Sequence, residues 1–327
     1  MKLVFGDLKM RSLFFMMKTA IVKNCYPPLS EIKPKVIFLC NKIEAHGGLS
    51  DRMHGMISVY KLCRELGLEY KLAHFHPFDI SLYLQPNKVD WYIPEEYVDM
   101  NKHNVVIVDC PILPNKITGF TDRQGFYYHL NRLTKALKKA SKKGKQIHVY
   151  SNTSLTTPEE YNKYFHELFK PSEDLQRQVD WNLQQIGGEF VSVSTRFQNL
   201  MGDFKDGNAK ALDSEEEKKE YIRKCIGKVE EIHGKHPDKK MLVTSDSARF
   251  IEEVKKLPYV YVIPGKIGHV DYSPSNAHDI HLKTFLDLLT LSESSKLYYI
   301  VTGKMYGGHF AETASFINNR PYEVIRF

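Results

Sequence analysis

The chain has 327 residues, of which 42% are hydrophobic and 26% charged, and its formal net charge is +7. This ordinary globular balance excludes disordered and fibrous proteins, and the length predicts about two domains. The positive charge favours an anionic ligand such as a nucleotide, a sugar phosphate or a membrane surface, although a solubilising surface charge explains it equally well.

The cysteines predict a reducing compartment. They are odd in number, widely scattered and without a Cys-x-x-Cys pair: Cys25, Cys40, Cys63, Cys110 and Cys225. This pattern argues against a disulfide framework or a zinc finger. The most apolar early segment, residues 13–17, is too short for a membrane span and lacks a cleavage site, so neither a span nor a signal peptide is expected.

In the first half of the chain, short apolar runs alternate with helical patterns. Strands are expected at residues 36–40, 70–74, 105–108 and 147–150. Helices are expected at residues 51–66, at residues 122–143 and from Thr157, where a cap residue precedes Pro158.

The second half repeats this alternation. Strands are expected at residues 190–194, 241–244, 260–263 and 297–301, and helices at residues 214–233, 248–256, 281–293 and 310–318. Ser214 and Glu217 form a capping box at the start of the first of these helices. The alternation predicts an α/β fold with parallel sheets and helices on both faces. We place a boundary near Ile186, which gives two Rossmann-like domains, residues 1–186 and 187–327, facing each other across a cleft.

Three strand ends in the second domain carry polar residues, and doubly wound sheets bind ligands at that edge. Arg196 follows one strand, where its planar guanidinium suits a phosphate. The alternative is a surface arginine paired with Asp203. Asp246 and Ser247 follow the next strand, and for them the alternative is a plain helix cap.

The third strand end is a glycine-rich loop that leads into a helix. It contains Thr302, Gly303, His309 and Phe310. Backbone N–H groups at a helix N-terminus bind anions, although the spacing of this loop is not that of a Walker loop. This loop is therefore a candidate phosphate site.

In the first domain, Gly47 and Gly48 precede a helix that contains Asp51. A glycine pair there permits close approach to a ligand from the opposite domain. The alternative is a tight turn with a helix cap at Ser50.

Other features are weaker candidates. His278 and His281 share a helix start, but no carboxylate cluster completes a metal site, so a non-metal role is favoured. Residues 135–145 form a basic helix end, for which a solvated face is the default and contact with a membrane surface the alternative. The scattered aromatic residues form no stacking platform, so no nucleic-acid partner is expected.

Taken together, the loops resemble four motifs of the fucosyltransferase superfamily, which includes bacterial α-1,2- and α-1,6-fucosyltransferases, nodulation fucosyltransferases and protein O-fucosyltransferases. Residues 47–52 resemble its N-terminal glycine motif, and residues 194–196 its H-x-R motif, with Ser194 in place of the histidine. Residues 244–247 resemble the second motif. Residues 283–287 with 301–303 resemble the third, although the loop after it has few of the family's serines.

The resemblance implies a GT-B fold with the nucleotide-sugar donor bound by the second domain, the glycan acceptor on the side of the first, and neither a metal nor a cofactor. It implies that Arg196 binds the β-phosphate of GDP-fucose. The donor site would then consist of Gly47, Gly48, Ser194, Asp246, Ser247, Asp287, Thr302, Gly303, His309 and Phe310.

The chemistry of these residues fits an inverting, metal-independent glycosyltransferase that builds a glycan or surface polysaccharide. Arg196 would stabilise the leaving phosphate, and Asp51 and Asp203 are the candidate bases. A non-catalytic nucleotide-sugar or glycan-binding protein on the same fold stays open, as does a metal phosphoesterase around His278 and His281. We expect a cytoplasmic protein, with peripheral contact with the inner membrane as an open option.

Overall fold

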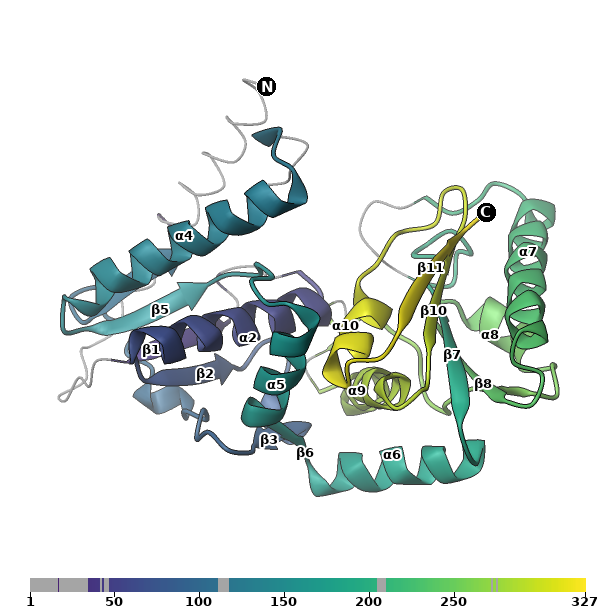
Figure 1. Ribbon diagram of the computed structural model, residues 1–327, viewed down its shortest axis with the longest axis horizontal. Helices are drawn as coiled ribbons and strands as arrows, with labels where there is room; N and C mark the ends of the chain where they lie inside the picture. Colours follow the sequence, from purple (N-terminus) through teal and green to yellow (C-terminus); the bar gives the residue numbers. More distant parts are fainter. Residues whose placement is uncertain are drawn as a thin grey trace. The chain divides into compact units, whose positions relative to one another are not determined.

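The structure is a computed structural model that describes residues 17, 35–41, 43, 47–110, 118–204, 210–271, 273–274 and 276–327. Cys25 and most of the apolar segment 13–17 lie outside the described residues. The chain divides into two compact units, residues 1–170 and 171–327 (Figure 1).

A four-stranded parallel sheet forms the centre of the first unit, in the order β2-β1-β5-β4. Its strands are β1 (Val36–Cys40), β2 (Tyr70–His74), β4 (Val105–Asp109) and β5 (Gln146–Tyr150). Helix α2 (Leu49–Leu66) packs on β1 and β2, α4 (Asp122–Ser141) on β4 and β5, and α5 (Pro158–Leu168) on α2. The unit also contains the 3₁₀ turns η1 (Ile80–Leu82) and η2 (Glu95–Tyr97), and β3 (Leu84–Pro86), which pairs with β6 (Phe169–Pro171).

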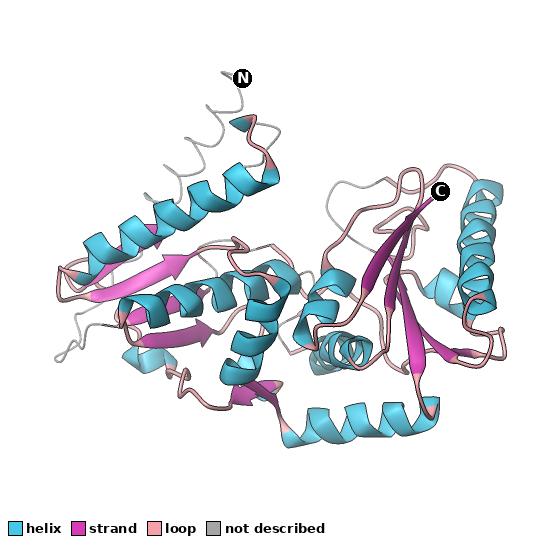
Figure 2. Ribbon diagram, in the orientation of Figure 1, coloured by secondary structure: helices cyan, strands magenta, loops and turns pink. Residues whose placement is uncertain are grey.

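The second unit contains a five-stranded parallel sheet, in the order β11-β10-β7-β8-β9 (Figure 2). Its strands are β7 (Phe190–Thr195), β8 (Lys240–Ser245), β9 (Val260–Tyr261), β10 (Leu297–Val301) and β11 (Tyr322–Arg326). Its helices are α6 (Glu173–Ile186), α7 (Glu215–Gly234), α8 (Ala248–Val254), α9 (His278–Ser292) and α10 (Phe310–Ile317). β7 and β10 are buried along their whole length, as expected for central parallel strands.

Several helices begin where the sequence signals predict. The Thr157 hydroxyl accepts a hydrogen bond from Glu160 N, the Glu160 carboxylate accepts one from Thr157 N, and Pro158 opens α5. Ser214 likewise accepts from Glu217 N at the start of α7. The second half of that predicted capping box is not formed, because Glu217 ion-pairs with Lys304.

The α/β class and the parallel sheets are confirmed. The sequence patterns missed helix α6, the edge strand β11, the short strands β3 and β6, and both 3₁₀ turns. The predicted boundary at Ile186 coincides with the end of α6, which packs against α9 of the second unit. The two compact units therefore divide at Lys170–Pro171, before this helix.

Two further expectations concern cysteines and membrane spans. All four cysteines in the described part of the chain are buried thiols. Among the described residues, none of the helices combines the length and the apolar character needed to cross a bilayer.

Candidate functional site

The second sheet changes its winding direction between β7 and β10. From β7 the chain runs outward through α7 and α8 to β9, then crosses back through α9 to β10 and on to β11. Figure 1 shows α7 and α8 on one face of this sheet and α9 and α10 on the other. Open α/β sheets bind ligands at the carboxyl ends of their strands where the strand order reverses. Arg196 follows β7 and Thr302 follows β10, so both lie at this switch point.

Arg196 lies beside Asp246, which follows β8. The Arg196 Nε atom is 3.8 Å from Asp246 Oδ2. The two carboxylate oxygens of Asp246 also accept hydrogen bonds of 2.8 Å from the backbone N–H groups of Phe197 and Gln198. Gln198 has a φ of +53°, which residues other than glycine seldom adopt, and these bonds help to hold it there. Asp246 therefore positions the arginine and its loop, and is not a helix cap.

Burial decides the protonation of Asp246. Desolvation raises the pKa of its carboxyl from 3.8 to about 6, although Arg196 and the two backbone N–H groups act to lower it. The Asp246 side chain is 9% exposed, whereas that of Arg196 is 29% exposed. The arginine is thus anchored by a buried carboxylate and still reaches solvent at the strand edge, as a site for an anion requires.

Asp203 and Ser247 form the start of α8. Ser247 is the N-cap and accepts a hydrogen bond from Phe250 N. Asp203 Oδ2 accepts from the Ser247 hydroxyl at 2.8 Å and from Arg249 N at 2.9 Å. The alternative in which Arg196 pairs with Asp203 is therefore wrong, because Asp203 is committed to this helix start and Asp246 is the partner of Arg196.

The loop after β10 folds onto Arg196. The Tyr299 hydroxyl bridges this loop by donating to Tyr306 O and accepting from Gly308 N at 3.0 Å. Tyr306 N donates to Arg196 O at 3.4 Å, and the Arg196 guanidinium lies 5.8 Å from the centre of the Tyr306 ring. A Cβ atom on Gly308 would lie 3.3 Å from Arg196 Cδ, so glycine permits this close approach.

The predicted residues of that loop fall into two groups. His309 is the N-cap of α10, Phe310 is its first residue, and His309 Nδ1 lies 2.8 Å from Glu312 Oε2. The Thr302 hydroxyl instead donates a hydrogen bond to the backbone oxygen of Phe327. Gly303 has a φ of +53°, and the next residue, Lys304, donates a backbone hydrogen bond of 3.3 Å to the Tyr221 hydroxyl of α7. The loop is thus held at one end by α7 and leads into α10 at the other.

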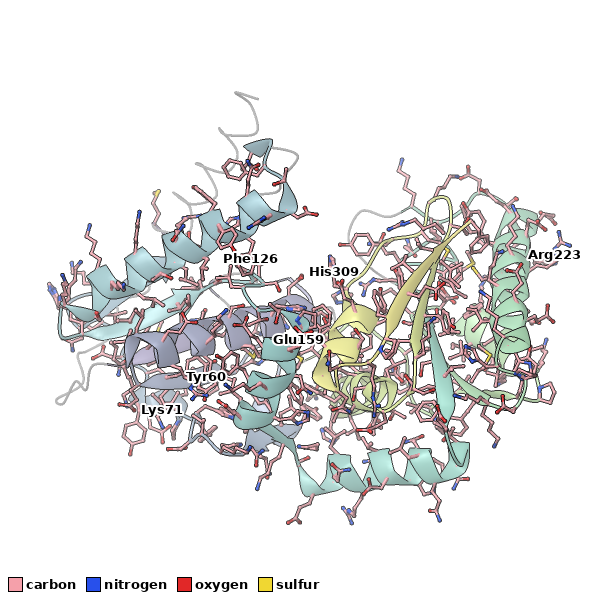
Figure 3. The ribbon with its side chains drawn as sticks, in the orientation of Figure 1. Tyr60, Lys71, Phe126, Glu159, Arg223 and His309 are labelled. Carbon is pink, nitrogen blue, oxygen red and sulfur yellow. The ribbon has the colours of Figure 1, made fainter. Side chains whose placement is uncertain are left out.

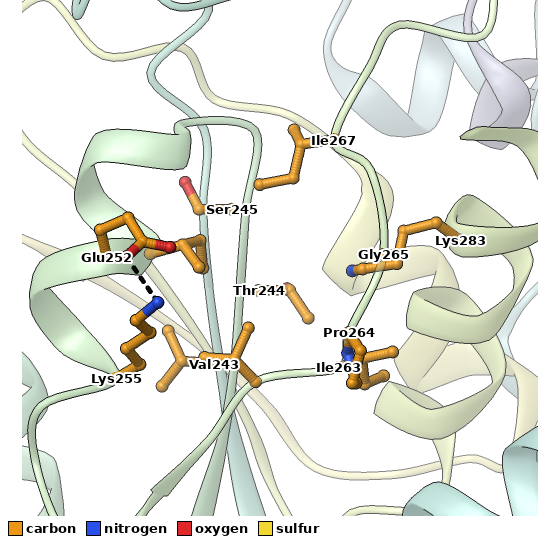
Figure 4. Close-up of a pocket in the computed structure, with 12 residues that line it drawn as sticks. Val243, Thr244, Ser245, Glu252, Lys255, Ile263, Pro264, Gly265, Ile267 and Lys283 are labelled. Atoms are coloured by element: carbon orange, nitrogen blue, oxygen red, sulfur yellow. Dashed lines mark ion pairs between the residues drawn. The ribbon is translucent and has the colours of Figure 1, made fainter. Parts of the chain in front are cut away.

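A pocket of about 250 Å³ lies next to this site, at the carboxyl end of β8 (Figure 4). Thr244, Ser245, Gly265 and Lys283 are among its lining residues. Lys283 Nζ is 2.6 Å from both carboxylate oxygens of Asp287, and burial raises the pKa of that aspartate. Asp287 is therefore connected to the pocket through Lys283.

The remaining predicted residues lie elsewhere. Ser194 is inside β7 and buried. Gly47, Gly48 and Asp51 lie in the first unit at the start of α2. Gly47 has a φ of +73°, and a Cβ atom there would be 2.4 Å from Asp51 Oδ2, so only glycine fits. The alternative of a helix cap at Ser50 does not hold, because Gly48 is the N-cap and its carbonyl accepts a hydrogen bond from Arg52 N.

Sequence reasoning missed Tyr299, Tyr306 and Lys283 as contributors to this region. Tyr299 stands in a fully buried strand, and a buried tyrosine hydroxyl needs a partner, which was the one available signal. His281, for which a non-metal role was favoured over metal binding, is buried. Among the described residues there is no cluster of three or more His, Cys, Asp or Glu side chains suited to a metal.

No family model and no curated protein matches the sequence. Solved structures do match the fold. A crystal of NodZ α-1,6-fucosyltransferase soaked with GDP-fucose has a TM-score of 0.54 and 13% identity, over 90% of this chain and 95% of that chain; a NodZ structure from Bradyrhizobium matches equally well. POFUT1 in complex with GDP has a TM-score of 0.53 and 12% identity, over 91% and 99%.

A plant protein matches the fold to a similar extent as NodZ and POFUT1. A mutant of Arabidopsis thaliana FUT1 in complex with GDP has a TM-score of 0.52 and 11% identity, over 95% of this chain and 74% of that chain. The chain therefore has the GT-B fold of fucosyltransferases, which confirms the fold that the motifs implied.

Proposed function

We propose that the protein is an inverting, metal-independent glycosyltransferase that transfers fucose from GDP-fucose to a glycan or surface polysaccharide. The observation that carries this proposal is the half-buried Arg196 at the switch point. The support from comparison is that three proteins of this fold were solved with GDP or GDP-fucose.

Arg196 would act on the leaving group. When the bond from the sugar to the nucleoside diphosphate breaks, negative charge grows on the terminal phosphate. A preorganised cation lowers the energy of that transition state, and the loss of one such donor typically costs about 3–4 kcal/mol. Backbone N–H groups around Gly303 and at the start of α10 would add hydrogen bonds to the same phosphates.

The pocket beside β8 would take the nucleoside. It opens next to Asp246, whose neighbour Ser245 lines it, and its wall contains Lys283, which is ion-paired with Asp287. Ser247 and Asp287 would then act indirectly, by fixing the start of α8 and the ammonium of Lys283.

The acceptor hydroxyl needs a base in a single inverting displacement. Of the two candidates, Asp203 already accepts two hydrogen bonds through one oxygen. Asp51 is thus the better candidate, and Gly47 and Gly48 would let the donor approach it. We place the reaction in the cytoplasm, as the buried thiols suggest.

A donor panel tests the proposal. The protein is incubated with GDP-fucose, GDP-mannose, UDP-glucose and UDP-N-acetylglucosamine, and the released nucleoside diphosphate is quantified by chromatography. We expect release from GDP-fucose alone, and GDP should raise the melting temperature because it binds the folded state. A melting shift without release from any donor would favour a non-catalytic binding protein. The absence of both the melting shift and the release would contradict the proposal.

A further inference from the structure

The exposed face of α4 carries an unbalanced positive charge. Between Asp122 and Glu159 the chain has no acidic residue but eight lysines and arginines. Six of these eight are lysines that lie within residues 135–145, at the carboxyl end of α4 and in the turn that follows it. Because the carboxyl end of a helix carries a partial negative charge, this is where lysines are tolerated best.

The packing of α4 determines which face is exposed. Its buried residues follow one another at intervals of three or four and turn toward β4 and β5: Gly125, His129, Leu133, Leu137 and Ala140. The opposite side presents exposed residues, which we call the α4 stripe: Tyr127, Tyr128, Lys135, Lys138, Lys139 and Lys142. At 100° per residue the stripe spans about 120° of the helix surface, and at 1.5 Å per residue it is about 22 Å long. Figure 3 labels Phe126 on α4, which directly precedes Tyr127 in the sequence.

Helix α7 provides an internal contrast, because it has the same length of 20 residues. On α7, four of the five lysines and arginines are ion-paired within one turn: Lys218 with Glu215, Arg223 and Lys224 with Glu220, and Lys228 with Glu231. Among the described residues, the four lysines of the α4 stripe form no ion pair. The charge of α4 is thus available to an external anion.

We infer that the α4 stripe docks on a membrane surface rich in anionic lipids. A straight row of flexible ammonium groups suits many separate headgroups, each of which attracts a nearby lysine. Tyr127 and Tyr128, 49% and 40% exposed, lie at one end of the row, and tyrosine is favoured at the lipid–water interface. Nucleic-acid phosphates are more often bound by the planar fork of arginine, and the stripe contains none. This inference does not depend on the proposed transferase activity.

The test measures partitioning of the full chain onto vesicles by co-sedimentation. Vesicles of phosphatidylcholine alone are compared with vesicles containing about one-third phosphatidylglycerol, in low and in physiological salt. The test variant carries K135Q, K138Q, K139Q and K142Q. The control variant carries K219Q, R223Q, K224Q and K228Q on α7. Both variants lower the formal net charge from +7 to +3.

We expect the wild type and the α7 variant to bind the anionic vesicles, more weakly in physiological than in low salt, and not to bind the neutral vesicles. One lysine near an anionic surface contributes about fivefold in partitioning, so the loss of four should weaken binding of the α4 variant about 600-fold. Its melting temperature should be unchanged, because the four side chains are exposed.

Three results would overturn the inference. They are an equal loss of binding in both variants, no preference of the wild type for anionic over neutral vesicles, and no binding at all. Binding of a fluorescent DNA duplex is measured as well, for the wild type and the α4 variant. Binding of the duplex by the wild type, lost in the α4 variant and without vesicle binding, would reassign the stripe to nucleic acid.

Discussion

The carboxyl edges of the two sheets are built on the same βαβ plan, yet they are completed differently. In the first unit, α2 lies directly on the loop that follows β5. The Ser58 hydroxyl accepts a hydrogen bond of 2.8 Å from Leu155 N, and Lys61 Nζ donates to Leu155 O at 3.2 Å. Gly55 permits this contact, since a Cβ atom there would lie 2.1 Å from Ser151 O. The chain thus covers this part of the edge with its own helix.

In the second unit, the loops at the switch point hold one another and leave a cation at the edge. Asp246 anchors Arg196 from the β8 side and Tyr299 fixes the loop from the β10 side. Strand ends occur in both units, so they do not by themselves distinguish the edge that we propose as the ligand site. The proposal rests on a charged side chain that is 29% exposed and whose position is set by a buried partner.

The largest expected effect is on Arg196, because this comparison assigns it the functional role. We expect Arg196→Ala to lower kcat by about 10²–10³ while the protein stays folded, since charge on the leaving phosphate grows in the transition state. Arg196→Lys keeps the charge but loses the fork, and should recover only part of the rate.

Turnover and melting temperature are measured for both variants. Arg223→Ala is the matched control, because this arginine forms an exposed ion pair on α7 that is worth less than about 1 kcal/mol. Turnover close to wild type in a folded Arg196→Ala variant would remove Arg196 from the mechanism.

A second prediction concerns the buried anchor, Asp246. Its raised pKa means that the folded protein holds this proton more tightly than the unfolded chain does. The stabilisation is fully present below about pH 4 and is lost as the pH rises through about 6. Relative to Asp246→Asn, which cannot titrate, the wild type should therefore lose about 2 kcal/mol of unfolding free energy between pH 4.5 and 7.5. Urea unfolding at several pH values measures this difference, and parallel pH profiles of the two proteins would contradict it.

The packed edge of the first unit gives a third prediction. Gly55→Ala should lower the free energy of unfolding by about 1–3 kcal/mol, because the new methyl group meets the backbone oxygen of Ser151, which has little room to move. Gly227→Ala on α7 is the matched change, since nothing lies within 4 Å of its Cβ position. There the better helix propensity of alanine should stabilise by up to about 1 kcal/mol. Equal urea midpoints for the two variants would show that α2 is not packed as described.

The sequence predicted the secondary-structure elements better than it predicted which side chains interact with one another. Alternating apolar runs were enough to place eight of the eleven strands in the described part of the chain, and to predict Arg196 at a strand end, because burial and period are local properties. They did not distinguish Asp203 from Asp246 as its neighbour, since that choice depends on the register of β7 against β8, where Thr195 lies opposite Ser245. Helix α6 was missed, although Ser172 caps it and Gly187 ends it. The facing of two domains across a cleft stays a prediction.

The smallest expected effect is that of a chelator. In the proposed reaction Arg196 and backbone N–H groups stabilise the negative charge of the leaving diphosphate, so no divalent cation is required. Activity measured with and without EDTA should agree within error, and added Mg²⁺ or Mn²⁺ should not change it. Loss of turnover on chelation, restored by either ion, would contradict this prediction. It would also weaken the contrast between the two edges, because the switch point would then need an ion to complete what Arg196 is proposed to do alone.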